Sequence, residues 1–562
     1  MADTVDDDRD HLHSMGYAQE LHRGMSTFSN FAISFSIISI LAGGFTSFWL
    51  GMVTSGPRVI TLGWVIVGFF ALLVGMAMGE ICSAYPTAGG LYYWSAKLAK
   101  KNAARWSWFT GYFNLIGQIG VIASVDYGLA VFTAYFIRMF DDSFKLTVTS
   151  IFIIFLIMLV VHGMLNTFRI DLVKVLGNIS VWWHVAGVAI IAGVLFIAPT
   201  NKRGIGGAFD KAPPGLTGWT GGVFVTVYLF ALGLLLAQYT ITGFDASAHV
   251  SEETKGARTE APKAIVRSIY ISAVAGLILN LSMIAALPKP GKDGDALYAG
   301  LVFGDKNDPF LVNAANRLIS SAVGSGAAKL LVFIAVMGQF FCGLASVTAN
   351  SRMIYAFSRD GALPGSKHWH KINKRTRTPT NSVWLGVTLS AIVGASSLYV
   401  RGTGAGRYST AFFAMTGICV IGLYIAYAIP IYLRLTNPDF KVGPWNLKGY
   451  HKIVGWTSIV WIAIISVLFC APLFWPFWKP WGSGNMFLDD GAGNSFFKIN
   501  NFNFTGPLIL LGAIFVMGYW RFSGKKWFTG PKVQGTREEL LAIERELDAL
   551  EHGRSVDPDH MA

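Results

Sequence analysis

The sequence predicts an all-α integral membrane protein with twelve transmembrane helices, and three observations lead to this fold class. Only 14% of the 562 residues are charged, against about 25% in ordinary soluble proteins. Hydrophobic residues make up 53% of the chain before glycine is counted, and they gather in runs of about 20 residues, the length that crosses a ~30 Å hydrocarbon core. These runs are continuous, whereas the strands of a membrane barrel alternate polar and apolar residues. A soluble enzyme, a nucleic-acid-binding protein and a disordered scaffold are therefore disfavoured.

Twelve apolar runs have the length of a membrane span. They lie at 28–53, 59–80, 106–137, 146–165, 174–198, 219–248, 263–287, 328–357, 383–400, 411–433, 453–475 and 506–520. The 45 Lys and Arg residues set the orientation, because basic residues collect in cytoplasmic loops. Most of them fall in the tails or in loops on the same side as the tails. Both termini are therefore predicted to be cytoplasmic, and the net charge of +13 reflects topology.

The N-terminal tail and the first span differ sharply in character. The tail, residues 1–27, is acidic and is predicted to be solvated and disordered. The span carries Gly43 and Gly44 at mid-depth, and each glycine weakens a helix by roughly 1 kcal/mol. Broken helices occur in membranes where they line a cavity, and an unwound turn would expose N–H groups that suit a carboxylate. Close helix packing through small residues is the alternative.

Two later spans carry titratable side chains. Asp126 lies in the middle of the third span, where an unpaired carboxylate would be costly or would stay protonated. It is expected to carry a proton or to contact a substrate amine, and a packing role beside Ser124 is the alternative. His184 lies in the fifth span and titrates near physiological pH, so it is a candidate proton relay. A structural histidine bonded to a carbonyl is the alternative there.

The sixth span is also interrupted. Thr240, Thr242, Gly243 and Asp245 lie within six residues, and such a stretch makes a poor continuous helix. The break in the first span thus recurs five spans later. Paired interruptions of this kind point to a transporter built on an inverted repeat.

Charged residues mark the cytoplasmic ends of several spans. Glu80 and Arg352 end the second and eighth spans, and Arg359 and Asp360 lie one step further. Such charges either form gate pairs or anchor loops, because long side chains at helix ends reach water. The charged run at 252–258 is expected to form a solvated face.

The C-terminal tail, residues 524–562, contains a periodic apolar pattern. Leu540, Ile543, Leu547 and Leu550 recur at helical spacing, which predicts a short amphipathic helix. This helix either lies on the cytoplasmic face or docks a partner protein.

Three stretches resemble the amino acid–polyamine–organocation superfamily. They are GEICSAYPTAGGLYYW at 79–94, TITGFDASAHVSEET at 240–254 and SRMIYAFSRDGALP at 351–364. More narrowly, they resemble its amino acid/choline transporter branch, which includes GABA permeases and bidirectional amino acid transporters. The resemblance implies the leucine-transporter-type fold. Helices 1–5 (residues 28–200) and 6–10 (201–435) would form inverted repeats, and helices 11 and 12 (436–523) would be peripheral.

The resemblance also implies a substrate site between the broken helices 1 and 6. By position, Ala42, Gly43 and Gly44 would offer N–H groups to a substrate carboxylate, and Ser39 would add a hydroxyl. An ammonium group would meet the carbonyls of Thr240, Ile241, Thr242 and Gly243. Asp245 would attract a cationic amine or would cap the second half-helix. His184 lies at about the position of a lysine in some proton-coupled relatives, and this departure leaves the coupling ion open.

The expected function is secondary transport of an amino acid or a related zwitterion such as GABA by alternating access, with proton symport or exchange. The protein is expected in a plasma membrane or a bacterial inner membrane. A transporter of cationic amines, such as putrescine or choline, is the alternative. No cofactor and no nucleic-acid partner is expected, and the oligomeric state stays open. A membrane-embedded enzyme is disfavoured, because the acids and histidines of the spans are scattered singly and form no catalytic motif.

Overall fold

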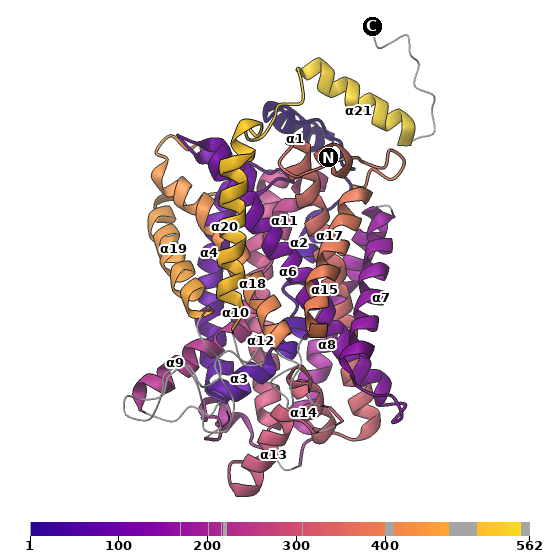
Figure 1. Cartoon of the computed structure of the whole chain (residues 1–562), viewed down its shortest axis with the longest axis vertical. Coiled ribbons are helices and arrows are strands. Elements are labelled where there is room, and N and C mark those ends of the chain that lie inside the picture. The colour runs from indigo at the N-terminus through magenta and orange to yellow at the C-terminus, as the bar shows by residue number, and fades with distance from the viewer. Residues whose placement is uncertain are drawn as a thin grey trace.

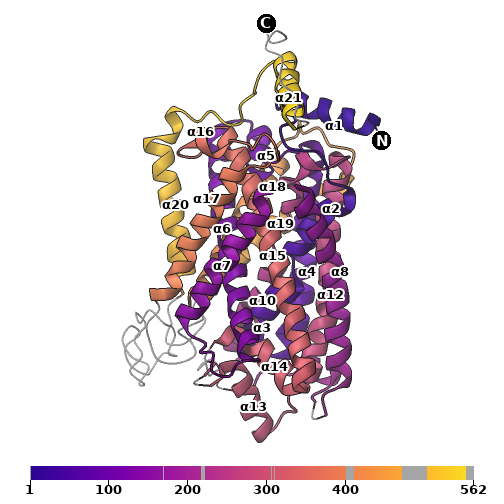
Figure 2. The same cartoon turned by 90° about the vertical axis from the view of Figure 1, so that its right-hand side faces the viewer.

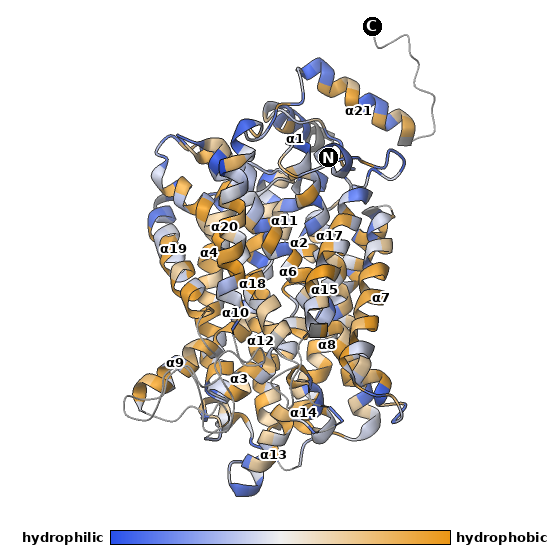
Figure 3. Ribbon diagram, viewed as in Figure 1, coloured by the Kyte–Doolittle hydropathy of each residue, from blue (hydrophilic) through white to orange (hydrophobic). Residues whose placement is uncertain are grey.

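Both tails lie at one end of an elongated helical bundle (Figure 1). We call this the terminal end and the opposite one the distal end. Within the part of the chain that the structure describes, twelve helices are long and apolar enough to cross a membrane, as the sequence predicted. Apolar residues fill the middle of the bundle and polar residues gather toward its two ends (Figure 3). The computed structural model describes residues 2–168, 170–200, 202–214, 216, 222–305, 307–308, 310–399, 410–470 and 503–551.

Among the first five spans, the first is interrupted between α2 (Thr27–Ile37) and the π-helical turn that follows it. Ser26 caps the N-terminus of α2, the first helix of the first span, by accepting the N–H of Ser29 at 3.1 Å. A short helix, α5 (Leu91–Leu98), follows the second span. The spans are α2 (Thr27–Ile37) with the π-helical turn η1 (Ile40–Gly44) and α3 (Phe48–Thr54), η2 (Val59–Gly63) with α4 (Trp64–Ala84), α6 (Ala103–Arg138), α7 (Val148–Thr167) and α8 (Ile170–Ile197).

The sixth span, predicted as one stretch at 219–248, consists of three pieces. They are α9 (Val223–Gly233), α10 (Leu235–Thr240) and α11 (Ala246–His249). The later spans are α12 (Ala257–Ala286), α15 (Ser325–Arg359), α17 (Thr380–Gly394), α18 (Thr410–Thr436), α19 (His451–Leu468) and α20 (Thr505–Phe522). Between them lie α13 (Lys292–Phe303) and α14 (Ala314–Ala322) at the distal end and α16 (Ser366–Trp369) at the terminal end.

Glycines bring the central helices into backbone contact. A Cβ atom on Gly117 of α6 would lie 2.6 Å from the backbone nitrogen of Leu423 in α18. One on Gly422 would lie 2.9 Å from the Cα of Gly117, so neither helix tolerates a side chain here. In contrast, α20 runs along the outside of the bundle (Figure 2), and few of its residues are buried. Part of the glycine surplus therefore serves ordinary helix packing.

The described parts of both tails, residues 2–27 and 524–551, contain helices that pack on the terminal end. The acidic N-terminal run forms α1 (Ala2–Ser14) and buries Asp8, so the prediction of a disordered, solvated tail is wrong. Asp8 accepts the N–H of Gly256 at 2.6 Å, and this tertiary bond orders the run. The predicted C-terminal helix is confirmed as α21 (Arg537–Glu551), with Leu540 and Leu547 on its buried side.

Candidate functional site

The first span is interrupted at Ile38 and Ser39, a few residues before the glycine pair that suggested the break. α2 ends at Ile37, Ser39 adopts an extended backbone, and η1 begins at Ile40. The Ser39 hydroxyl accepts the N–H of Ala42 at 3.0 Å, so a side-chain cap decides where the helix restarts. The glycines themselves lie inside the following π-helical turn.

The sixth span unwinds between Thr240 and Ala246. Gly243 adopts a φ of +91°, a conformation that glycine reaches without steric cost. A Cβ atom here would also lie 2.3 Å from a methyl carbon of Ile37 in α2. Two of the predicted carbonyl acceptors already have donors, since Ile241 receives the Tyr424 hydroxyl and Gly243 receives the Ala246 N–H.

The two breaks touch each other at Gly43. A Cβ atom on Gly43 would lie 2.8 Å from both the Cα and the hydroxyl oxygen of Thr240. Close packing through a small residue, the alternative reading of this glycine, is therefore realised at the point where the two breaks meet. No neighbour lies within 4 Å of the corresponding place on Gly44.

A closed cavity lies beside this contact, between the two broken helices. Its volume of about 10 Å³ is roughly what one water molecule requires, so the surrounding helices are closed on it. Two of the lining residues, Cys342 of α15 and Cys419 of α18, carry buried free thiols. The lining residues are Ile37, Gly43, Val121, Val125, Tyr239, Thr240, Thr242, Cys342 and Cys419.

The N–H groups predicted for a carboxylate are engaged locally in this closed form. The N–H of Ala42 bonds the hydroxyl and the carbonyl of Ser39, and the N–H of Gly43 bonds the same carbonyl at 2.9 Å. A carboxylate would have to share or replace these bonds. Ser39 and Ala42 thus lie at the restart of the helix, directly before the cavity-lining Gly43.

His184 contacts the first break directly. Its Nε2 lies 2.6 Å from the Ser39 hydroxyl oxygen, and its Nδ1 lies 2.8 Å from the carbonyl oxygen of Ser180. A carbonyl only accepts, so Nδ1 carries a proton and Nε2 accepts from the serine hydroxyl. The carbonyl contact is the one expected of a structural histidine. The same side chain also positions Ser39.

Asp126 pairs with a residue that sequence reasoning left unassigned. His162 of α7 places its Nδ1 3.1 Å from Asp126 Oδ1, and both side chains are wholly buried. Gly343 makes room for the pair, because a Cβ there would lie 2.1 Å from Asp126 Oδ1. Ser124 instead receives the Tyr239 hydroxyl and donates to a carbonyl of its own helix. The interpretation of the buried acids as single, scattered groups is therefore wrong.

Asp245 also pairs with a histidine rather than capping α11. Its carboxylate receives the Tyr427 hydroxyl at 2.6 Å and the Gln118 amide at 3.0 Å, and it lies 3.2 Å from Nε2 of His249. Its side chain makes no bond to the N–H groups that begin α11, so the capping interpretation is wrong. Nor does Asp245 line the closed cavity.

The two predicted gate charges have different partners at the terminal end. Arg352 forms a two-pronged contact with Glu253, with its shorter N–O distance at 2.7 Å. Glu80 pairs with Arg434 at 3.1 Å. A further buried pair joins Arg359 to Glu252 at 3.1 Å.

Glu252 and Glu253, which pair with Arg359 and Arg352, were not among the predicted gate residues. Both are at most 1% exposed, so the interpretation of the 252–258 run as a solvated face is wrong for these two acids. Their motif was visible in the sequence. What the sequence lacked was any sign that α15, about 100 residues later, brings two arginines to them.

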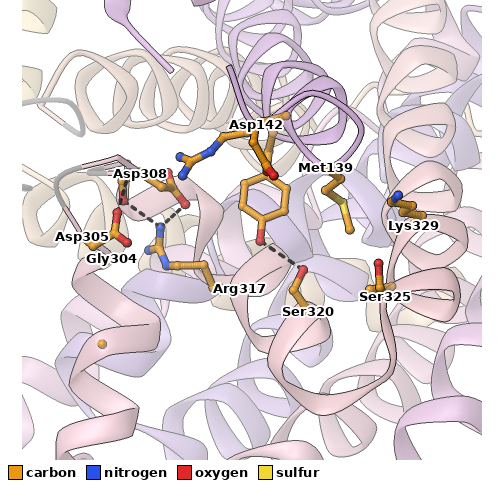
Figure 4. Close-up of a pocket in the computed structure, with 13 residues that line it drawn as sticks. Met139, Asp142, Gly304, Asp305, Asp308, Arg317, Ser320, Ser325 and Lys329 are labelled. Atoms are coloured by element: carbon orange, nitrogen blue, oxygen red, sulfur yellow. Dashed lines mark hydrogen bonds and ion pairs between the residues drawn. The ribbon is translucent and has the colours of Figure 1, made fainter. Parts of the chain in front are cut away.

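A larger pocket has a volume of about 590 Å³, and none of its lining residues comes from the two broken spans; Figure 4 shows the side chains that line it. It opens to the surface among the end of α6, α13, α14 and the start of α15. Its Arg317 already bonds Asp308 at 2.7 Å and two backbone carbonyls of α13. The chemistry predicted for a zwitterion belongs to the breaks, so volume alone does not identify the site.

A family model and the similar proteins all point to the same family of transporters. The family model described as amino acid permease matches residues 25–517. The chain is 38% identical to the Amino-acid permease BAT1 of Arabidopsis thaliana over 92% of this chain and 95% of the relative. A homolog from Oryza sativa subsp. japonica is 35% identical over 92% and 94% of the two chains. The GABA-specific permease of Saccharomyces cerevisiae is 30% identical over 82% and 78%.

Proposed function

The chain belongs to the amino acid permease family, a branch of the amino acid–polyamine–organocation superfamily with the leucine-transporter-type fold, and from this premise we propose that it carries an amino acid or a related zwitterion such as GABA by alternating access. One observation carries the proposal. The two interrupted spans meet at Gly43 and Thr240 beside a closed cavity inside the bundle. Broken helices at such a place present helix ends to a charged substrate without exposing the backbone to lipid.

The polarity of the two breaks supports a zwitterion. The start of η1 gathers the N–H groups of Ala42, Gly43 and Gly44 beside the Ser39 hydroxyl, and helix starts favour a carboxylate. The end of α10 gathers the carbonyls that begin at Thr240, which favour an ammonium group. A molecule with both groups would bridge the two breaks once the cavity widens.

A cationic amine without a carboxylate is the competing substrate. Asp126 and Asp245 favoured it as free acids, but each is paired with a histidine, and the residues that line the closed cavity include no acid. An amine would therefore need one of these pairs to break.

Uptake into liposomes that contain the purified protein tests the proposal. Labelled GABA and labelled putrescine are each offered alone and with the other as competitor. We expect GABA to enter and to be displaced by other amino acids. Entry of putrescine that no carboxylate-bearing compound reduces would contradict the proposal and support the amine alternative.

For the driving force we propose protons, either as symport or through exchange, with Asp126 and His184 as the candidate groups. Asp126 and His162 form a buried titratable pair, and His184 contacts Ser39 at the first break. Uptake should accelerate under an inward proton gradient, and His184→Ala should lose this acceleration. Sodium-dependent transport that ignores pH would contradict proton coupling. We further propose that the terminal end faces the cytoplasm of a plasma membrane or a bacterial inner membrane, following the basic residues.

A further inference from the structure

His249, at the end of α11, makes a contact that fixes one of its protons. Its Nδ1 lies 2.9 Å from the carbonyl oxygen of Ala88, in the segment between α4 and α5. A carbonyl oxygen only accepts hydrogen bonds, so Nδ1 must carry a proton. In a neutral imidazole the other nitrogen, Nε2, then presents a lone pair.

That second nitrogen faces a carboxylate. Nε2 lies 3.2 Å from Oδ2 of Asp245, and two lone pairs at this distance would repel each other in a buried site. One further proton between the two groups removes the repulsion. Asp245 already accepts from Tyr427 and Gln118, which favours its ionised form, so the extra proton belongs on the ring.

Asn114 of α6 fits the same assignment. Its side-chain nitrogen lies 3.2 Å from Nε2 of His249, while its Oδ1 is buried with no hydrogen-bond partner among the described residues. Turning the amide by 180° would give an Nε2–H group a second acceptor and would remove the unsatisfied oxygen.

The burial of Asp245 and His249 favours a pair whose two charges cancel. Asp245 and His249 are both 0% exposed. The titratable groups that face them from α18 are the hydroxyls of Tyr424 and Tyr427 and the thiol of Cys419, and α6 contributes only amides. No lysine or arginine bonds either member in the described part of the chain. An imidazolium and a carboxylate together carry no net charge, whereas a neutral ring would leave a buried, uncompensated carboxylate.

Ala88 links this pair to the gate charges of the terminal end. Its carbonyl accepts from His249, and its N–H donates to Glu252 at 2.9 Å. Glu252 is in turn paired with Arg359 of α15. The backbone approaches the ring closely at Gly90, whose φ is +48° and where a Cβ would lie 3.1 Å from the ring.

Four parts of the bundle therefore meet at the pair: α11, α6, α18 and the segment between α4 and α5. Of the three pieces of the sixth span, α11 lies nearest the terminal end (Figure 1). Opening of this end would move α11 away from its neighbours and admit water. In water the proton on Nε2 can leave to solvent, with His249 left neutral and Asp245 ionised.

We propose that Asp245 and His249 form a proton-binding site that holds one proton while the terminal end is closed and releases it when this end opens. The proposal rests on the proposed transport function and adds to it a step that binds and releases a proton. The proton would be taken up again when the end closes, so each cycle would exchange one proton with the terminal side.

A direct test measures the protonation of the ring without any transport. Full-length protein with ¹⁵N-labelled histidine is reconstituted in lipid and its ring nitrogens are recorded by solid-state NMR between pH 6 and 8, with His249→Gln used to assign the signal. We expect the signal of a doubly protonated ring in the wild type and of a neutral ring in Asp245→Asn. A neutral His249 ring in the wild type at pH 6 would overturn the proposal.

A functional test uses exchange of labelled GABA across proteoliposomes with equal pH on both sides. For one obligatory proton, the wild-type rate should change by about tenfold per pH unit on one limb of its profile, and His249→Gln should flatten that limb. His162→Gln removes the histidine of the other buried pair, Asp126–His162, and therefore shows which of the two pairs sets that limb. A His249→Gln protein that keeps the wild-type profile would overturn the proposal, as would a profile flattened only by His162→Gln. If the wild type moves neither GABA nor any other amino acid, the proposed function fails, whereas the NMR result still decides the proton site.

Discussion

The two broken helices are in contact at Gly43, where the side chain is a single hydrogen atom. Any larger group at this position would press on the backbone of Thr240 rather than on the flexible end of a side chain. Such overpacking costs about 1–3 kcal/mol in a close-packed interior. At the residue scale, the geometry of the candidate site therefore depends on the absence of one methyl group.

Gly43→Ala should separate the breaks and damage the site. We expect a loss of about 1–3 kcal/mol in stability, with a lower apparent melting temperature, and a rise in the KM for GABA. Gly193→Ala is the control, since this glycine also lies in a membrane span and an added Cβ would meet no atom of a neighbouring element within 4 Å among the described residues. Equal melting temperatures and KM values for the two variants would contradict this account.

Asp360, one residue beyond α15, titrates in the physiological range. Burial raises its pKa to about 6, against the opposing effects of Arg359 and of hydrogen bonds from the Lys532 N–H, Tyr92 and Tyr17. A carboxyl whose pKa is higher in the folded state than its ordinary value of 3.8 binds a proton more tightly when folded. Its contribution to stability is therefore fully present below that ordinary value and is lost as pH rises through about 6.

This sign gives a measurable pH dependence. Between pH 4 and pH 7 the wild type should lose on the order of 1–3 kcal/mol of stability relative to Asp360→Asn, which cannot titrate. Thermal unfolding of both proteins at a series of pH values measures the difference. Melting curves that shift in parallel with pH would exclude Asp360 as the titrating group.

Single residues also show where sequence reasoning stops. Asp126 was recognised as an acid inside the membrane, but its partner His162 lies 36 residues away on another helix, and no spacing rule connects the two. Glu252 and Glu253 were recognised as part of a motif, yet their burial depends on arginines about 100 residues later. Residue types and local breaks are encoded locally, whereas the partners of a buried charge depend on tertiary contacts.

At the scale of elements, the short piece 246–254 that follows the second break is tied to α15 at the terminal end. It contains α11 and the two acids that pair with Arg352 and Arg359 of α15. Both pairs are buried, and removing one partner of a buried pair typically costs about 3–5 kcal/mol because the other charge is left without compensation. The closed state of this end is therefore sensitive to either arginine or either acid.

Glu253→Gln should favour opening of the terminal end. The cavity thiols Cys342 and Cys419 should then react faster with a thiol reagent added on that side, by at least about tenfold if only ~1.4 kcal/mol of the lost pairing shifts the equilibrium. Alkylation followed by mass spectrometry measures the rates. Lys374→Gln, which removes an ion pair with an exposed lysine, should leave them unchanged. Unaltered thiol rates in Glu253→Gln would show that this pair does not hold the end closed.

The elements themselves were largely predictable, for a physical reason. Length and continuity of the apolar runs are set by the membrane, so the twelve spans follow from composition. The position of the first break was predicted a few residues late, because glycine propensity marks a weak helix but the Ser39 cap decides where the next turn begins. The order of α1 could not be predicted, since it depends on the buried contact between Asp8 and Gly256 rather than on the polarity of the run.

At the scale of the whole molecule, the two tails meet over the buried ion pairs Arg352–Glu253 and Arg359–Glu252, which we call the gate pairs. Residues 15–25, which we call the N-terminal segment, run between the gate acids and the C-terminal tail. Gln19 donates to the Glu252 carbonyl at 2.8 Å, and its own N–H donates to Glu544 of α21 at 2.7 Å. Glu544 also contacts His13 at 2.7 Å. The C-terminal helix thus holds the N-terminal segment against the acid that pairs with Arg359.

Glu544→Ala should loosen the N-terminal segment without unfolding the bundle. Tryptic cleavage after Arg23, which is buried against Asp8 and Thr254, should become on the order of tenfold faster as local opening becomes cheaper by about 1.4 kcal/mol. Time-resolved proteolysis with mass spectrometry measures the rate. Glu546→Ala, on the same helix, removes only the contact with the exposed Lys374 and serves as the control. Equal cleavage rates for the two variants would contradict the role of Glu544.

The contact between Gln19 and Glu544 joins residues 525 positions apart, and this has a consequence for biosynthesis. At roughly 5–20 residues per second, a ribosome makes the second residue about 30–100 s after the first. Throughout that interval the N-terminal segment has no helix to hold it against the gate. A chain cut short by a premature stop codon just before α21 would still contain every membrane span, but its gate would lack this restraint. Synthesis of α21 is therefore the step that adds this restraint on the N-terminal segment.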